Sequence, residues 1–196
     1  AGAGARAMSD AGAPDPDRRK VVTWLWRLPV LAVLGGAGYG LYEAINVHFL
    51  KRSPARDPVF EEVPAVEVGR LTAFAGTWDA IEFTLTTATA AVPAVAFRVP
   101  GPVQGGLDVA PLNLIAFSRI CTHQHCIVSL NTDVNAITFG FNYDTSSPAL
   151  TCPCHLSVFD PQRAGRAVSG PANLPLPRVR LALQGDMVMA TGLETA

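Results

Sequence analysis

The 196-residue sequence has few charged residues: 15 Lys and Arg against 16 Asp and Glu, with a formal net charge of −1. This balance argues against nucleic acid as a partner, because neutralising phosphates requires clustered Lys and Arg. Cysteine is also scarce, since the chain has four and none precedes Cys121. Four thiols are too few for a disulfide-rich scaffold. Their confinement to one stretch indicates a local role.

An apolar run lies near the N-terminus. Residues 1–20 are rich in Ala, Gly, Pro and Asp, which predicts a disordered tail, and they end in three consecutive basic residues. Residues 21–50 are predicted to hold one transmembrane anchor helix, because Val21 to Tyr42 contain a single charge, Arg27. At about 1.5 Å per residue this run spans roughly 33 Å, enough for the hydrocarbon core of a bilayer.

Two other interpretations of this run are a buried core helix and a cleaved secretory signal. The basic flank followed by Trp24 and Trp26 favours a membrane anchor, and no clear small-x-small cleavage site follows the run. The basic residues before the span predict a cytoplasmic N-terminus and a C-terminal domain on the extracytoplasmic side of the inner (cytoplasmic) membrane. Lys51, Arg52 and Arg56 on the far side weaken this asymmetry.

Residues 51–65 contain three prolines and alternating charges, which predicts a flexible tether. Residues 66–196 are predicted to form one mainly β domain, an antiparallel sandwich or small barrel with long loops. No stretch of it shows sustained helical periodicity. The predicted strands are short segments rich in β-branched and aromatic residues: 81–87, 94–99, 112–118, 127–130, 136–141, 178–183 and 187–190.

Two short segments hold all four cysteines and three of the four histidines: Cys121-Thr-His-Gln-His-Cys126 and Cys152-Pro-Cys-His-Leu-Ser157. Each offers a thiolate and an imidazole at tight spacing, so together they outline a metal site. A structural zinc site would leave two cysteines idle, and two plain disulfides would not explain the clustered histidines. An iron–sulfur cluster accounts for every residue, with a Cys pair on one iron and a His pair on the other.

The two segments resemble the Rieske iron–sulfur proteins, whose loops have the forms Cys-Thr-His-x-x-Cys and Cys-Pro-Cys-His-x-Ser. The resemblance implies a [2Fe-2S] cluster with Cys121 and Cys152 on the inner iron and His123 and His155 on the outer iron. It also implies a disulfide between Cys126 and Cys154 that joins the loops.

The same resemblance implies roles for residues around the cluster. Ser157 stands where the family's serine donates a hydrogen bond to a cluster sulfide. Gly170-Pro171-Ala172 resembles the start of a proline-rich loop that covers the cluster. Phe159 replaces a tyrosine of high-potential members, so its missing hydroxyl predicts a lower reduction potential.

Other positions depart from the family's usual pattern. Gln124 and His125 replace Leu-Gly, and Leu156 replaces Gly. His125 is an alternative ligand, but His123 is favoured because only it keeps the Cys-x-His spacing. The 28 residues between His123 and Cys152 predict a longer hairpin around residues 131–147.

The resemblance implies the iron–sulfur subunit of a quinol–cytochrome c oxidoreductase, not catalytic alone. The expected partners are a cytochrome b-type membrane subunit that supplies the quinol pocket, a c-type cytochrome that accepts the electron, and the membrane. His155, and then His123, are expected to hydrogen-bond quinol with coupled proton and electron transfer. The alternatives are the Rieske subunit of another exported oxidase resembling arsenite oxidase, a soluble oxygenase ferredoxin and, from a different class, a zinc-stabilised binding module.

Overall fold

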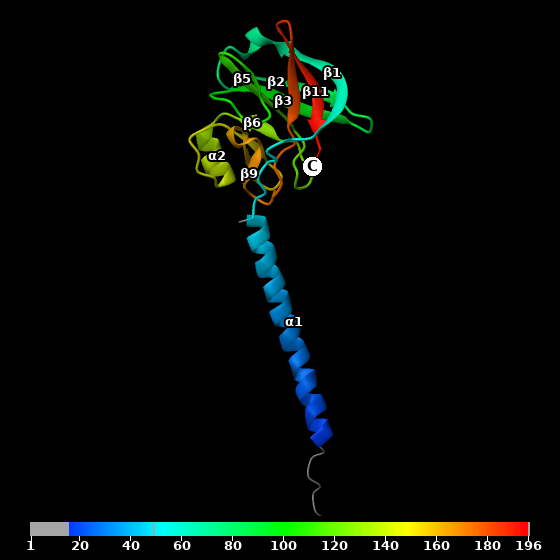
Figure 1. Cartoon of the computed structure of the whole chain (residues 1–196). Coiled ribbons are helices and arrows are strands. Elements are labelled where there is room, and N and C mark those ends of the chain that lie inside the picture. Colours follow the sequence, from blue (N-terminus) through cyan, green and yellow to red (C-terminus); the bar gives the residue numbers. More distant parts are fainter. Residues whose placement is uncertain (1–15, 49, 196) are drawn as a thin grey trace, which may run out of the picture. The chain divides into compact units, whose positions relative to one another are not determined.

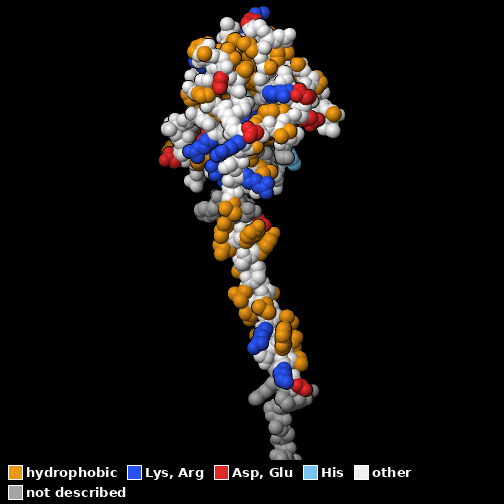
Figure 2. Space-filling model, viewed as in Figure 1, with side chains coloured by type: hydrophobic (Ala, Val, Ile, Leu, Met, Phe, Trp, Pro, Cys, Tyr) orange, Lys and Arg blue, Asp and Glu red, His pale blue; other side chains and the backbone are white. Residues whose placement is uncertain are grey.

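The computed structural model describes residues 16–48 and 50–195 and divides the chain into two compact units, up to Glu43 and from Ala44 onward. The predicted apolar helix is present as α1, Pro16–His48 (Figure 1). Hydrophobic side chains cover its visible face, and Lys and Arg lie toward its N-terminal end (Figure 2). Its span Lys20–Ile45 has a mean hydropathy of 1.4, so the helix is a candidate membrane anchor.

The helix α1 begins before the end of the predicted disordered tail, residues 1–20. Residues 16–20 belong to α1, while residues 1–15 lie outside the described part of the chain. Asp17 lies in the first turn of the helix, where its carboxylate interacts favourably with the helix dipole. Lys20 Nζ lies 3.4 Å from Asp17 Oδ1, one turn away on the same face.

The second unit is built from three antiparallel sheets, which confirms the mainly β prediction (Figure 1). Their strand orders are β1-β11-β10, β2-β3-β5-β4 and β6-β7-β8-β9. The strands are β1 Phe60–Arg70, β2 Ala80–Thr86, β3 Ala91–Val99, β4 Leu107–Val109, β5 Leu112–Ser118, β6 Ser129–Asn131, β7 Ala149–Cys152, β8 Ser157–Asp160, β9 Arg166–Ser169, β10 Val179–Gln184 and β11 Met187–Glu194. Two short 3₁₀ turns, η1 Leu71–Phe74 and η2 Pro161–Arg163, follow β1 and β8.

The sheet that contains β3 and β5 packs on both of its faces. Along β3, Ala94 and Ala96 contact a core shared with β1, β10 and β11, whereas Val95 and Phe97 contact a second core. Because successive side chains of a strand point to opposite faces, this sheet is the middle layer of the domain. The second core includes Cys121 and Cys152, so the metal-binding segments are packed directly on this layer.

The segment predicted as a strand at 136–141 is instead a helix, α2, Val134–Phe141. The Asp133 carboxylate caps it by accepting hydrogen bonds from the backbone N–H groups of Asn135 and Ala136, both at 3.0 Å. Asn142 ends the helix in the left-handed conformation. These caps outweigh the β propensity of the intervening residues. The longer hairpin predicted around residues 131–147 is present, because β6 and β7 pair antiparallel up to Asn131 and Ala149, and α2 lies in their connection.

Strand β1 begins earlier than the predicted domain boundary at residue 66. Phe60 already pairs with Glu194 on β11, so residues 60–65 belong to the sheet and not to a free tether. A fully buried arginine, Arg178, lies beside this pairing. Its Nε and Nη2 atoms donate to the two carboxylate oxygens of Glu194, at 2.8 and 2.7 Å.

We expect the Arg178–Glu194 ion pair to be important for stability. Glu194→Gln leaves the buried guanidinium without its counter-charge and should lower the free energy of unfolding by about 3–5 kcal/mol. Urea unfolding followed by circular dichroism measures this loss. The control is Asp186→Asn, which makes the same change in the exposed pair with Arg70 and should cost less than about 1 kcal/mol. Equal losses in the two variants would contradict the prediction.

Candidate metal centre

The first motif segment forms a tight turn. Ile120 and Ile127 pair across its base, and Cys121 N donates to Cys126 O at 2.8 Å. His125 N donates back to Cys121 O at 2.9 Å, and His125 has a positive φ of 57°. The turn buries the Cys121 side chain, which is 1% exposed, and leaves His125 on the surface.

The second motif segment is the tip of the β7–β8 hairpin. Cys152 ends β7 and pairs with Ser157, the first residue of β8, so the four residues between them form an exposed turn. Leu156 reverses the chain with a positive φ of 59°. Cys152 is buried at 1% exposed, as Cys121 is, whereas His155 is exposed. Each loop therefore presents a buried thiol and a more accessible imidazole.

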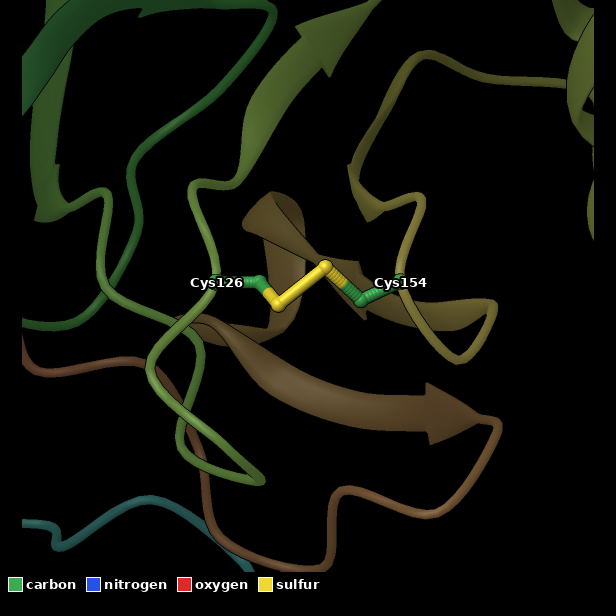
Figure 3. Close-up of a disulfide and its surroundings, with 2 residues drawn as sticks. All are labelled: Cys126 and Cys154. Atoms are coloured by element: carbon green, nitrogen blue, oxygen red, sulfur yellow. A yellow bond between two sulfur atoms is a disulfide. The ribbon is translucent and has the colours of Figure 1, made fainter.

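The two loops are joined by a disulfide between Cys126 and Cys154, which confirms the pairing that the family resemblance implied (Figure 3). Beside it, the imidazole rings of His123 and His155 meet edge to face, with centroids 4.8 Å apart. The structure thus brings one histidine from each loop together.

The thiols of Cys121 and Cys152 are neighbours. Burial raises the pKa of the Cys121 thiol; the backbone N–H of His123 opposes this shift, and the nearby Cys152 adds to it. Two buried thiols and two adjacent imidazoles, contributed equally by two loops, match the sulfur and nitrogen donors of a cluster with a Cys pair and a His pair. The Sγ atoms of Cys126, Cys152 and Cys154 also lie within 4.8 Å of one another, but two of them are in the disulfide and are not thiolates.

A third segment, which begins at Gly170-Pro171-Ala172, lies against the second loop. Ala172 N donates to Ser157 Oγ at 3.1 Å, so the Ser157 hydroxyl proton stays available for another acceptor. Gly170 has a φ of +75°, and a Cβ there would lie 2.5 Å from Leu156 O and from Ser157 Cα. Only glycine permits this close approach of the two backbones.

Phe159 is fully buried in the same core as both thiols, and its side chain has no hydroxyl group. Two further residues that the sequence did not indicate contact the segment beginning at Gly170. Thr122 Oγ1 donates to Leu174 O at 2.9 Å and so joins the first loop to the third segment. The ammonium of Lys51 bonds the carbonyl oxygens of Gly170 and Ala172. No local signal marks either residue, because each contact joins parts of the chain that are far apart in sequence.

A cavity of about 690 Å³ lies elsewhere on the domain, between the segment before β7 and η2. Its lining is polar and includes Tyr143, Asp160 and Arg163. Burial and the Asp160 carboxylate raise the pKa of Tyr143. The predicted cysteine and histidine ligands are all in the described part of the chain, and none of them lines this cavity.

Residues 108–180 match the family model of the Rieske [2Fe-2S] domain. The cytochrome bc1 complex Rieske iron-sulfur subunit of Streptomyces lividans is 33% identical over 73 residues, which are 37% of this chain and 36% of that protein. The iodate reductase subunit IdrB of Denitromonas iodatirespirans is 28% identical over 133 residues, 68% of this chain and 64% of that protein. The matched segments thus cover from about a third to just under two thirds of the length of these relatives.

Among solved structures, the soluble domain of the Rieske protein II from Sulfolobus acidocaldarius superposes with a TM-score of 0.50 and 22% identity. The match covers 67% of this chain and 78% of that one, and it shows a shared fold. Both motif loops fall inside the segment that the family model matches, and the structure folds them side by side over two buried thiols. The chain carries a Rieske domain of the kind that binds a [2Fe-2S] cluster.

Proposed function

We propose that this chain is the membrane-anchored electron-transfer subunit of a quinol–cytochrome c oxidoreductase. The observation that carries the proposal is the pair of adjacent imidazoles, one from each loop, on loops that also each hold a buried thiol. We assign Cys121 and Cys152 to one iron and His123 and His155 to the other. A cluster ligated in this way supplies one-electron transfer at a higher potential than an all-cysteine [2Fe-2S] cluster.

The thiols and the imidazoles have different surroundings and therefore different roles. Packing against β3 and β5 keeps the two thiols out of water. The exposed His155 is placed to accept a hydrogen bond from a quinol hydroxyl at a ring nitrogen, and the half-buried His123 is the second candidate. An imidazole can gain or lose a proton near neutral pH, which suits proton transfer coupled to oxidation of quinol.

The partners follow from what this chain contributes to the membrane. The described residues contain one helix long and apolar enough to cross a membrane, and a single helix encloses no intramembrane cavity. The quinol pocket would therefore belong to a cytochrome b-type subunit, and the electron would pass to a c-type cytochrome. The bc1 Rieske subunits among the relatives support this assignment. The basic residues before the helix support a cytoplasmic N-terminus with the cluster domain on the extracytoplasmic side.

A second candidate is the Rieske subunit of a different respiratory oxidoreductase. It is favoured by the length of the match to an iodate reductase subunit, 133 residues against 73 for the Streptomyces lividans bc1 subunit. The cluster domain would be shared by the two functions. The electron donor and acceptor would differ, because they are set by the partner subunits.

The complex that contains this chain should distinguish these candidates. Purified from its own membranes, it should contain b-type haem and reduce cytochrome c with quinol, and His155→Ala should slow the reaction at least tenfold. Absorption spectra and stopped-flow reduction of cytochrome c measure both properties. A complex without b-type haem that reduces iodate and leaves cytochrome c oxidised would favour the second candidate.

The histidine assignment can be tested on the chain alone. His123→Ala and His155→Ala should lose iron and the electron paramagnetic resonance signal of the reduced cluster, because each removes a ligand. His125→Ala is the matched control, since its ring lies in the same loop but on the surface, and it should keep about two irons per chain. Loss of iron in His125→Ala alone would reverse the assignment of the first loop, and zinc in place of iron would support a zinc-stabilised module.

The state of the cysteines gives an independent check. After removal of iron and unfolding without reductant, alkylation should modify Cys121 and Cys152 only, because Cys126 and Cys154 are held in the disulfide. After reduction, all four should react. Peptide mass spectrometry identifies the modified residues. Alkylation of Cys126 or Cys154 before reduction would contradict the assignment.

A further inference from the structure

Residues 51–59, most of the predicted tether, are fixed to the cluster domain. Arg52 N donates to Asn173 O at 2.8 Å, and Thr195 N donates to Val59 O at 2.9 Å. Between these points, Nη2 of the buried Arg178 donates to Ala55 O at 2.9 Å. The segment is therefore bonded along its length and does not behave as a free linker within this unit.

Lys51 bonds the segment that contacts both cluster-binding loops. Its Nζ donates to Gly170 O and, at 2.7 Å, to Ala172 O. The side chain is partly buried, and this burial lowers the pKa of Lys51. Hydrogen bonds from an ammonium group to carbonyl oxygens are stronger than bonds between neutral groups. Lys51 thus places a positive charge and two strong donors on the segment that begins at Gly170.

Residues 170–174 lie between Lys51 and both cluster-binding loops. On the inner side, Ala172 N reaches Ser157 Oγ of the second loop at 3.1 Å, and Leu174 O accepts from Thr122 Oγ1 of the first loop at 2.9 Å. The outward contacts are with Lys51 and the backbone of Arg52. Ala172 therefore bonds Lys51 through its carbonyl and Ser157 through its N–H.

We infer that Lys51 is a positioning residue for the cluster site, holding residues 170–174 against the two loops that supply the ligands. This inference rests on the ligands proposed above. Loss of the ammonium removes two bonds from the segment and weakens the contact between Ala172 and Ser157. It also removes a positive charge that favours the more negative reduced cluster, so the reduction potential falls.

Three variants of the full-length chain separate these effects. Lys51→Met keeps the apolar stem of the side chain and removes the charge and the donors. Lys51→Arg keeps a cation with several donors and serves as the conservative rescue. Arg52→Met is the matched control, because it removes the same charge one residue away while the backbone bond from residue 52 to Asn173 stays. If Lys51→Met does not accumulate, Lys51→Gln replaces it, since Gln is neutral and keeps an amide donor.

Two measurements are needed: hydrogen–deuterium exchange of the peptide 168–176, and a redox titration followed by electron paramagnetic resonance. In Lys51→Met we expect about tenfold faster exchange of this peptide. We also expect an about threefold lower ratio of reduced to oxidised cluster at a fixed potential, which corresponds to a reduction potential about 30 mV lower for a one-electron couple. Lys51→Arg and Arg52→Met should match the wild type in both.

The two measurements together decide the inference. Faster exchange with an unchanged potential would mean that Lys51 has only a structural role. A changed potential with unchanged exchange would mean that Lys51 acts only through its charge, without positioning residues 170–174. Either result overturns the inference. Changes in exchange and in potential in Arg52→Met equal to those in Lys51→Met would also overturn the inference. If the wild-type chain binds no iron, the ligand assignment fails by itself, and unchanged exchange in Lys51→Met would then overturn the positioning role.

Discussion

The cluster site depends on the burial of two thiols against the middle sheet of the domain. Cys121 and Cys152 come from segments 31 residues apart, yet both pack in one core with side chains from β3 and β5. Both thiols are 1% exposed, and burial raises the pKa of the Cys121 thiol. The histidines stand nearer the surface on the same loops. The result is a site with a buried sulfur side and a more exposed nitrogen side.

Two kinds of restraint keep the loops in place around this core. The disulfide joins them covalently on one side, and residues 170–174 bridge them by hydrogen bonds on another. The second restraint depends on residues 51–59, because their backbone and the Lys51 side chain hold the bridging segment from outside. Arg178 connects the same system to the sheet through Glu194. The surroundings of the cluster site thus extend to the chain that leads toward the helix α1.

The sequence predicted those features whose cause is local. An apolar run after basic residues is enough to predict α1, and thiols and imidazoles at tight spacing are enough to predict a metal site. The strands β2, β3, β5, β10 and β11 were also predicted, because each is long enough to show its composition, and the segment predicted at 127–130 overlaps the short strand β6. Strands β7, β8 and β9 have four residues each, too few for such a pattern. The strand predicted at 136–141 failed because the caps at Asp133 and Asn142 decide the conformation.

The contacts of Lys51 with Ala172 and of Arg178 with Ala55 were not predictable, since each joins residues more than 100 positions apart. They bond residues 51–59 to the cluster domain at Lys51, Arg52 and Ala55, so this part of the predicted tether is not a free linker. The bonds of Lys51 and Arg52 also hold residues 170–174, which in turn contact both cluster loops. Residues 51–59 therefore belong structurally to the cluster domain.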